Sequence, residues 1–297
     1  MKDSDGIMAS TVPFRRVAII GTGLIGGSFA LALREIFSSI SLVGFSRSGS
    51  CDRAREAGVV DEATADLAQA VRGADLVYIA LPIGASIESL AAIAKSAEPH
   101  ALVTDACSTK TVICRAAKDH FRGGARFLGA HPMAGKEQFG VEHADAKLFR
   151  RAPYALMGTE TESDTDARVQ AFVEIVRSIG ARPIWSDPET HDWAVGIVSH
   201  LPQLVSVALA RVVQDETDET GLPLSLAGSG LRDMLRLAGS SYDIWRDILL
   251  TNTDNISRAL DRLAQAVDYL RTNLASKEIQ REFVTANELY KQLRKPS

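Results

Sequence analysis

The chain has 297 residues, a length that predicts about two domains, each large enough to bury its own core. Hydrophobic residues make up 46% and charged residues 24%, which is typical of a soluble globular protein and excludes a largely disordered or collagen-like chain. The formal net charge of -4 excludes a global positive field that would attract nucleic acid or an anionic membrane. We therefore expect a small-molecule ligand, with no nucleic-acid or membrane partner.

The N-terminal segment MKDSDGIMASTVPF contains no apolar stretch typical of a signal peptide, and no uninterrupted apolar run of about 18 residues follows it. The three cysteines show no CxxC spacing, so the sequence indicates neither a disulfide framework nor a metal site. These features predict a cytoplasmic protein.

Short apolar runs alternate with helical patterns from Val17 to Trp185, which predicts βαβ units around a largely parallel, doubly wound sheet of Rossmann type. Two late runs, Tyr154–Met157 and Pro183–Trp185, flank a helical stretch at about residues 166–179 and are expected to complete this sheet. The other expected strands are Val17–Ile20, Ser41–Phe45, Leu76–Leu81, Ala101–Asp105 and Phe127–Ala130.

The remaining sequence predicts long helices. Pro188–Glu216 opens behind a possible Asp187 cap with proline at the first helical position, and Ile244–Leu274 repeats apolar residues at spacings of three and four. We therefore predict an α/β dinucleotide-binding domain at residues 1–187 and an all-helical substrate and dimerisation domain at residues 188–297. Apolar faces on several long helices need a partner surface, which predicts a homodimer.

A glycine-rich turn is the strongest signal in the residues themselves. An apolar strand runs directly into the spacing G-x-G-x-x-G and then into an Ala/Leu-rich helix. Glycines let the backbone turn tightly and approach a pyrophosphate, which the N–H groups of the helix start stabilise. The motif alone is weak, but this strand–turn–helix context is the one it requires. The residues expected to bind the cofactor here and at a later strand end are Gly21, Gly23, Leu24, Ile25, Gly26, Leu81 and Pro82.

The segment after the second expected strand indicates which dinucleotide binds. An acidic residue near this position would bind the ribose 2′-hydroxyl of NAD. This chain instead has Ser46, Arg47 and Ser48, which could hold a 2′-phosphate by charge-assisted hydrogen bonds, although an exposed loop arginine would look the same. The sequence therefore favours NADP over NAD.

Two further segments fall at the carboxyl ends of expected strands, the edge where doubly wound sheets bind ligands. Ser108 follows one strand, and spacing alone favours a helix cap for it. His131 precedes Pro132, which holds its backbone extended, and its imidazole could accept a proton near neutral pH. A histidine in this position is more often a structural hydrogen-bond partner, so the residues alone leave both roles open.

Taken together, five motifs resemble the prephenate/arogenate dehydrogenase family of tyrosine biosynthesis. The resemblance extends from about Val17 to at least Ile248 and implies a Rossmann domain, a helical dimerisation domain and NAD(P)-dependent oxidative decarboxylation of a cyclohexadienol. The product would be 4-hydroxyphenylpyruvate from prephenate or tyrosine from arogenate, and the sequence leaves this choice open. The motifs are the glycine turn, Asp105-x-x-Ser108-x-Lys110, the stretch GAHPMAG at residues 129–135, Ser199-His200-Leu201-Pro202 and Asp233-x-x-Arg236.

The resemblance also implies roles for individual residues. His131 matches the catalytic histidine that hydrogen-bonds the ring hydroxyl, with Ser108 as its companion. The other matches are His200 and Arg236, which would bind polar groups of the substrate, and Glu137 and Asp233, which would lie around the site entrance. Gln203 departs from the pattern, because many relatives carry a second histidine there.

Two alternatives belong to other classes. Dehydrogenases of the β-hydroxyacid type share this domain order but rely on a lysine from the helical domain, and this chain has no lysine between Lys147 and Lys277. A non-enzymatic NADP(H)-sensing regulator would need no converging histidine, serine and arginine. His143 and His191 are interpreted as structural or solvated, and Cys107 as a buried, inert thiol.

Overall fold

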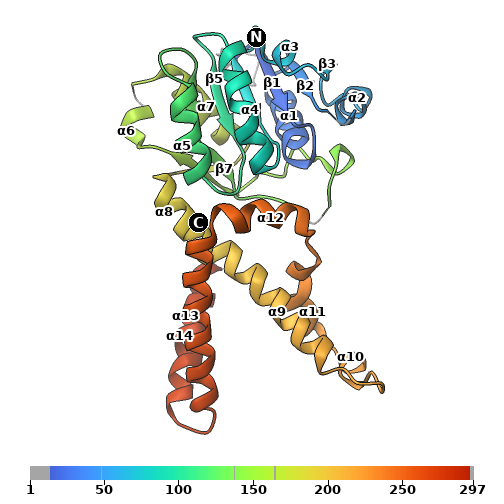
Figure 1. Cartoon of the computed structure of the whole chain (residues 1–297), viewed down its shortest axis with the longest axis vertical. Coiled ribbons are helices and arrows are strands. Elements are labelled where there is room, and N and C mark those ends of the chain that lie inside the picture. The colour runs from blue at the N-terminus through green and yellow to red at the C-terminus, as the bar shows by residue number, and fades with distance from the viewer. Residues whose placement is uncertain (1–13, 48, 137, 164, 295–297) are drawn as a thin grey trace, which may run out of the picture.

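The computed structural model describes residues 14–47, 49–136, 138–163 and 165–294. Its N-terminal part is an α/β domain, and its C-terminal part consists of helices that extend away from one end of that domain (Figure 1). The expected fold class, a Rossmann-type sheet followed by a helical region, is confirmed.

A six-stranded parallel sheet forms the centre of the α/β domain. Its strand order is β3-β2-β1-β4-β5-β6, so the direction of winding reverses between β1 and β4. Ligands of doubly wound sheets bind at the carboxyl ends of the strands beside such a reversal. The strands are β1 (Arg16–Ile20), β2 (Ser41–Phe45), β3 (Glu62–Thr64), β4 (Leu76–Ile79), β5 (Leu102–Asp105) and β6 (Arg126–Leu128).

Helices cover both faces of this sheet, which explains why β1 and β4 are almost wholly apolar and why β1, β4 and β5 are almost wholly buried. One core contains α1 (Leu24–Ile36), α2 (Ser50–Glu56) and α7 (Ala167–Ser178). The opposite core contains α3 (Leu67–Val71), α4 (Ile83–Ser96) and α5 (Thr111–His120).

The late strands do not complete this sheet, so that expectation is wrong. β7 (Ala130–Pro132), β8 (Pro153–Met157) and β9 (Arg182–Ser186) form a separate three-stranded sheet. The expected strand Phe127–Ala130 is divided between the two sheets, and the break falls at Gly129. Gly129 is closely packed, because an added Cβ would lie 2.5 Å from Sγ of Cys114. A hydrogen bond of 3.0 Å between the buried hydroxyls of Tyr78 and Tyr154 joins the sheets. Two short elements complete this region, η1 (Val141–His143) and α6 (Glu160–Ser163).

The helical region begins as expected. Asp187 caps α8 (Pro188–Val195), because its Oδ1 accepts a hydrogen bond of 2.8 Å from the backbone N–H of Thr190. The predicted long helix then widens into a π turn, η2 (Gly196–His200), before α9 (Leu201–Asp215). Pro202 has no N–H to bond the carbonyl one turn earlier, which accounts for a wider turn at this point.

The second predicted long helix, Ile244–Leu274, is divided at Asn252 into α12 (Tyr242–Thr251) and α13 (Thr253–Thr272). α12 packs against the α/β domain, and Oδ2 of Asp247 accepts a hydrogen bond of 2.8 Å from the backbone N–H of Gly84 at the start of α4. The helical region therefore meets the sheet at its carboxyl edge. The remaining elements are α10 (Leu222–Ser225), α11 (Ser229–Leu235), η3 (Arg236–Gly239) and α14 (Glu278–Leu293).

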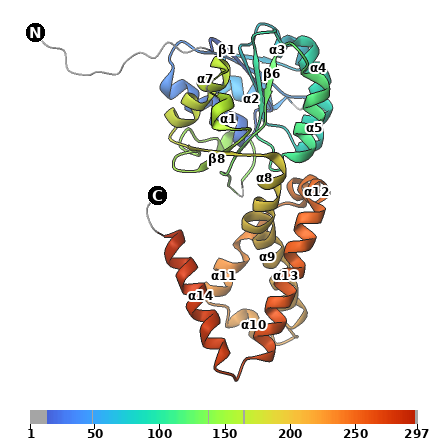
Figure 2. The same ribbon diagram turned by 90° about the vertical axis from the view of Figure 1, so that its left-hand side faces the viewer.

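Large apolar side chains lie exposed along this region. α13 and α14 form a hairpin that extends away from the α/β domain, and α9 to α11 form a second arm that diverges from this hairpin (Figures 1 and 2). By length and composition alone, the segment Pro188–Asp215 could cross a membrane, and 28% of its most apolar window is buried. Contiguous apolar surface of this extent indicates an interface. The exposed residues include Val198, Val212, Leu226, Leu274, Phe283, Leu289 and Leu293.

Candidate functional site

Three glycines shape the turn between β1 and α1. Gly21 has φ of +102°, its N–H donates to the carbonyl oxygen of Phe45 at 3.0 Å, and a Cβ on it would lie 2.5 Å from the backbone oxygen of Ala80. A Cβ on Gly26 would lie 1.9 Å from the carbonyl oxygen of Gly21. A Cβ on Gly23 would have no atom within 4 Å. Gly21 and Gly26 therefore permit the turn itself, and Gly23 leaves open space in front of it.

The start of α1 is suited to bind an anion. Its first turn carries no capping side chain and no acidic residue, so the free N–H groups and the positive end of the helix dipole have no competing protein anion. Together with the open space at Gly23, this arrangement fits the pyrophosphate of a dinucleotide.

A cleft of about 580 Å³ opens at the carboxyl edge of the sheet. Five of the residues predicted to bind the cofactor line it together with Ser108: Gly23, Leu24, Ile25, Leu81 and Pro82. The opposite wall comes from residues 134–136 and 138–140 and from Ile244, Asp247 and Ile248 of α12, and the sequence did not predict the contribution of α12. The break at Asn252 makes α12 a separate helix, and this helix covers the cofactor turn.

The predicted ribose-binding segment lies beside the glycine turn. Ser46 is buried and its Oγ accepts a hydrogen bond of 2.7 Å from Oγ of Ser50, while Arg47 is exposed. Both residues follow β2, and the carbonyl oxygen of its last residue, Phe45, accepts the hydrogen bond from the N–H of Gly21. Neither lines the cleft described above, and Ser48 lies outside the described residues.

A buried ion pair supports the strand that carries His131. The ammonium of Lys110 donates to Oδ2 of Asp105 and, at 2.7 Å, to the carbonyl oxygen of Ala130. Oδ1 of Asp105 accepts a hydrogen bond of 3.1 Å from the N–H of the same Ala130. Burial opposes a charge on Lys110, but the carboxylate of Asp105 more than compensates and holds the lysine pKa above its usual value. Both polar groups of Ala130 are thus fixed beside His131.

His131 lies within β7 and contacts a second histidine. Its Nδ1 is 3.0 Å from Nε2 of His191, and Nδ1 of His191 is 2.9 Å from Oδ1 of Asp192. All three side chains are buried. The interpretation of His191 as structural or solvated therefore misses a direct contact with His131. The signal that could have found it is the His-Asp pair in the first two turns of a helix capped by Asp187.

The surroundings of His131 favour its neutral form. Burial lowers its pKa well below the usual histidine value, and positive charge on His191, Lys110 or His200 lowers it further. An imidazole with a depressed pKa is unprotonated at neutral pH and can accept a proton there.

His200 lies in the π turn and is 1% exposed. Its Nδ1 is 3.1 Å from Nδ2 of Asn252, and because an amide nitrogen only donates, the proton of neutral His200 is on Nε2. Burial lowers its pKa to about 4 against the opposing charge of Asp192. The ring of Trp245 meets it edge-on at 5.7 Å between centroids. His200 can therefore act as a neutral hydrogen-bond donor.

Two residues predicted from the family resemblance do not line this cleft. Asp233 and Arg236 are exposed on α11 and η3, and neither lines the cleft. Gln203, at the departure from the family pattern, donates from Nε2 to the carbonyl oxygen of Leu237 at 2.9 Å and so attaches η3 to α9. Glu137 lies outside the described residues.

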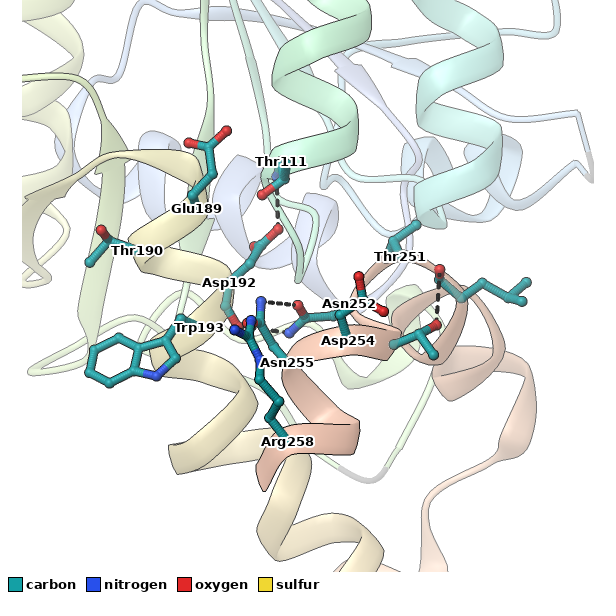
Figure 3. A pocket seen from close by; sticks show the side chains of 12 residues that line it. Thr111, Glu189, Thr190, Asp192, Trp193, Thr251, Asn252, Asp254, Asn255 and Arg258 are labelled. Carbon is teal, nitrogen blue, oxygen red and sulfur yellow. Dashed lines mark hydrogen bonds between the residues drawn. The ribbon is translucent and has the colours of Figure 1, made fainter. Parts of the chain in front are cut away.

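A second hollow of about 690 Å³ lies between α5, α8 and the α12–α13 junction (Figure 3). Figure 3 shows Asp192 directed from α8 toward Thr111 and Asn252 beside Asn255. Among the described residues, no group of three or more His, Cys, Asp or Glu side chains is placed to hold a metal ion. Cys107 is buried, and burial raises its pKa, which disfavours the reactive thiolate.

Comparisons with known proteins match both halves of the chain. Residues 29–185 match the family described as prephenate dehydrogenase, nucleotide-binding domain, and residues 187–291 match prephenate dehydrogenase, dimerization domain. The chain belongs to the prephenate/arogenate dehydrogenase family. It is thus an oxidoreductase that uses a pyridine nucleotide and acts on a small molecule. The first match begins after the glycine turn, so that turn is separate support for the cofactor site.

Three similar proteins illustrate the likeness. A prephenate dehydrogenase of Lactococcus lactis subsp. cremoris is 31% identical over 90% of this chain and 73% of its own length. The structure of prephenate dehydrogenase from A. aeolicus in complex with hydroxyphenyl propionate and NAD+ has a TM-score of 0.84 at 27% identity, covering 96% of this chain and 98% of that one. Synechocystis arogenate dehydrogenase has a TM-score of 0.78 at 31% identity, covering 94% of this chain and 99% of that one.

The two glycines separate folding from cofactor binding, which gives a testable prediction. Gly26→Ala should destabilise the chain by at least about 1–3 kcal/mol, because its Cβ would overlap the oxygen of Gly21. Gly23→Ala should keep the melting temperature within about 2 °C but weaken cofactor binding at least tenfold, because its Cβ would occupy the open space. Thermal unfolding and fluorescence titration with NADPH measure both effects. Equal loss of stability in both variants, with unchanged cofactor affinity, would contradict this account of the turn.

Proposed function

We propose that the chain oxidises and decarboxylates prephenate or arogenate, with His131 as the base that takes the proton of the ring hydroxyl. The observation that carries this proposal is the buried, neutral His131, placed by the Asp105–Lys110 ion pair. Ser108, two residues before that lysine, lines the cofactor cleft. One short segment therefore connects the cleft to the strand that carries His131.

The residues fit the proton movements of this reaction. The nicotinamide of the bound cofactor supplies the hydride acceptor. As the hydride leaves the ring carbon that bears the hydroxyl, the hydroxyl oxygen becomes acidic and its proton passes to the neutral imidazole of His131. Loss of carbon dioxide then leaves the electron pair of the broken C–C bond in the ring, which becomes aromatic.

The substrate's polar groups need donors close to the base. His200 has its proton on Nε2 and a depressed pKa, so it can donate to a carboxylate without carrying a charge of its own. Ser108 offers a hydroxyl from the cleft wall. The substrate-binding roles of Arg236, Asp233 and Glu137 stay predictions.

The helical region forms the dimer of this family, and we propose the division at residues 1–187 and 188–297. Two observations favour it: β9 ends at Ser186 and α8 begins at Pro188. A second copy would cover the exposed apolar side chains of α9, α13 and α14. The apolar composition of Pro188–Asp215 suits a helix buried between two chains. Location in the cytoplasm stays a prediction.

NADP is the cofactor that we propose over NAD. Arg47 is exposed directly after β2, beside the glycine turn, and neither Ser46 nor Arg47 supplies the carboxylate that would repel a 2′-phosphate. A guanidinium in this place can hold a phosphate with paired, charge-assisted hydrogen bonds.

Replacing the base tests the proposed reaction. His131→Asn should lower kcat by about two to four orders of magnitude while the fold and cofactor affinity are kept, because asparagine fits an extended backbone but has no basic nitrogen. The wild-type rate should fall as the pH drops below the usual histidine range, since activity needs the neutral ring and the pKa of His131 is depressed. Steady-state kinetics across pH measures both effects. A variant with near-normal kcat and the same acidic limb would assign the base to another residue.

Removing one guanidinium tests the cofactor preference. Arg47→Ala should lower kcat/KM for NADP by about tenfold or more and leave kcat/KM for NAD nearly unchanged, because only the former has a 2′-phosphate. Arg72→Ala removes an exposed arginine at the end of α3 and serves as the control. An unchanged ratio of the two efficiencies in Arg47→Ala would show that this residue does not bind the phosphate.

A further inference from the structure

A neutral histidine can act as a base only at the ring nitrogen that lacks the proton, and the surroundings of His131 determine which nitrogen that is. The starting point is Asp192 on α8. Burial opposes its ionisation, but hydrogen bonds from His191, Thr111 and Lys110 outweigh burial and hold its pKa below the usual value. Asp192 is therefore a carboxylate, which can accept hydrogen bonds but cannot donate them.

The orientation of the carboxylate is fixed from the other side. Its Oδ1 accepts a hydrogen bond of 2.7 Å from the backbone N–H of Lys110. Its Oδ2 accepts one of 2.8 Å from the backbone N–H of Thr111 (Figure 3). These two N–H groups begin α5, where the helix dipole also favours a negative charge. Asp192 is thus held in place independently of the histidine it contacts.

The protons of the two histidines follow from this fixed acceptor. Nδ1 of His191 faces the carboxylate at 2.9 Å and must donate to it. Nε2 of neutral His191 is then an acceptor, so Nδ1 of His131, at 3.0 Å, must be the donor. The proton of neutral His131 is thereby placed on Nδ1 and the basic lone pair on Nε2.

The second nitrogen of His131 is left open. Nε2 of His131 makes no hydrogen bond to a described residue. Among the described residues, no side-chain nitrogen or oxygen is both fully buried and without a partner, so this atom keeps some contact with solvent. It is therefore available to a hydroxyl of the substrate.

We propose that His191 and Asp192 are positioning residues that hold His131 as the Nδ1–H tautomer and stabilise the positive charge it gains when Nε2 takes a proton. The proposal rests on the proposed role of His131 as the base. When His131 becomes an imidazolium, its Nδ1–H still donates to His191, and that hydrogen bond becomes charge-assisted. The carboxylate of Asp192 lies at the far end of the same chain of hydrogen bonds.

The other charged groups around His131 do not supply this effect. Lys110 is already paired with Asp105, and its positive charge disfavours an imidazolium. Positive charge on His191 or His200 would also disfavour a charge on His131, so the proposed stabilisation by His191 and Asp192 requires the neutral form of His191. Asp192 is a carboxylate that is linked to His131 by hydrogen bonds through His191, so its negative charge can favour an imidazolium at His131.

Nitrogen NMR of histidine-labelled protein tests the tautomer without substrate or cofactor. The chain has six histidines, so single variants can assign the signals. At neutral pH we expect His131 to show a protonated Nδ1 and an unprotonated Nε2, and His200 to show the opposite pattern. An Nε2–H tautomer of His131 in the wild-type protein would overturn the proposal, whatever the variants do.

Kinetics of variants tests the effect on the reaction. His191→Phe keeps a ring of similar size but removes both nitrogens, and it should lower kcat by about 10- to 100-fold, as when an orienting partner is lost, with little change in KM or cofactor affinity. His191→Gln, whose amide oxygen can accept from Nδ1 of His131, should recover part of kcat and retain the protonated Nδ1 signal. His120→Gln, at an exposed histidine at the end of α5, is the control and should behave as the wild type.

The outcomes separate this proposal from the function on which it rests. If His131→Asn loses turnover but His191→Phe retains both kcat and the His131 tautomer, the positioning role of His191 and Asp192 is wrong and the role of His131 as the base is right. If His131→Asn itself keeps turnover, His131 is not the base, and His191 and Asp192 have no catalytic group to position. If His191→Phe does not fold, the wild-type tautomer and the His191→Gln variant still decide the question.

Discussion

Lys110 and Asp105, which have no exposed surface, form an ion pair beneath the site, and the rest of the site depends on it. The pair holds both backbone groups of Ala130, and the backbone N–H of the same lysine donates to Asp192. One residue thus connects β5, β7 and α8. Removing one partner of a buried pair costs about 3–5 kcal/mol because the other charge is left unpaired. The pair is therefore a constraint on where His131 and its partners lie.

The helical region completes a site that the α/β domain begins. The domain supplies the glycine turn, Ser108 and His131, whereas α8, the π turn and the α12–α13 junction supply His191, His200 and Asn252. Asn252, at the α12–α13 junction, connects α8 to the π turn. Its Nδ2 donates to the carbonyl oxygen of Asp192 in α8 and faces Nδ1 of His200 in the π turn. The departures from regular helix, at residues 196–200 and at Asn252, therefore fall where side chains must be directed toward the sheet.

Local patterns in the sequence predicted those parts of the fold that depend on local physics. The glycine turn, the strands β1, β2, β4 and β5 and the Asp187 cap follow from periodicity, backbone sterics and capping, and these strands appear within one or two residues of their expected bounds. The short strand β3 was not predicted. The second sheet could not be predicted in this way, because the apolar run at residues 127–130 looks like one strand in sequence although it divides at Gly129 between two sheets. Pairing between residues as far apart in sequence as Pro132 and Tyr154 or Pro153 and Arg182 leaves no local signal.

The candidate site shows the same division. Leu24, Leu81 and Ser108 were found because they follow strand ends, and strand ends meet at one edge of a parallel sheet. The partners of His131 were missed because His191 is 60 residues away and looks like an ordinary helical histidine in sequence. Asp233 and Arg236 came from family resemblance alone, and the cleft of a single chain does not contain them.

The central claim is that this chain couples reduction of a pyridine nucleotide to loss of carbon dioxide from a cyclohexadienol. The most direct measurement follows absorbance at 340 nm and released carbon dioxide together, using purified protein with prephenate or arogenate and either nucleotide. The account predicts one reduced nucleotide formed for each carbon dioxide released, with at least one of the two substrates. Absence of nucleotide reduction with both substrates and both nucleotides, in protein that is folded and binds NADPH, would contradict it.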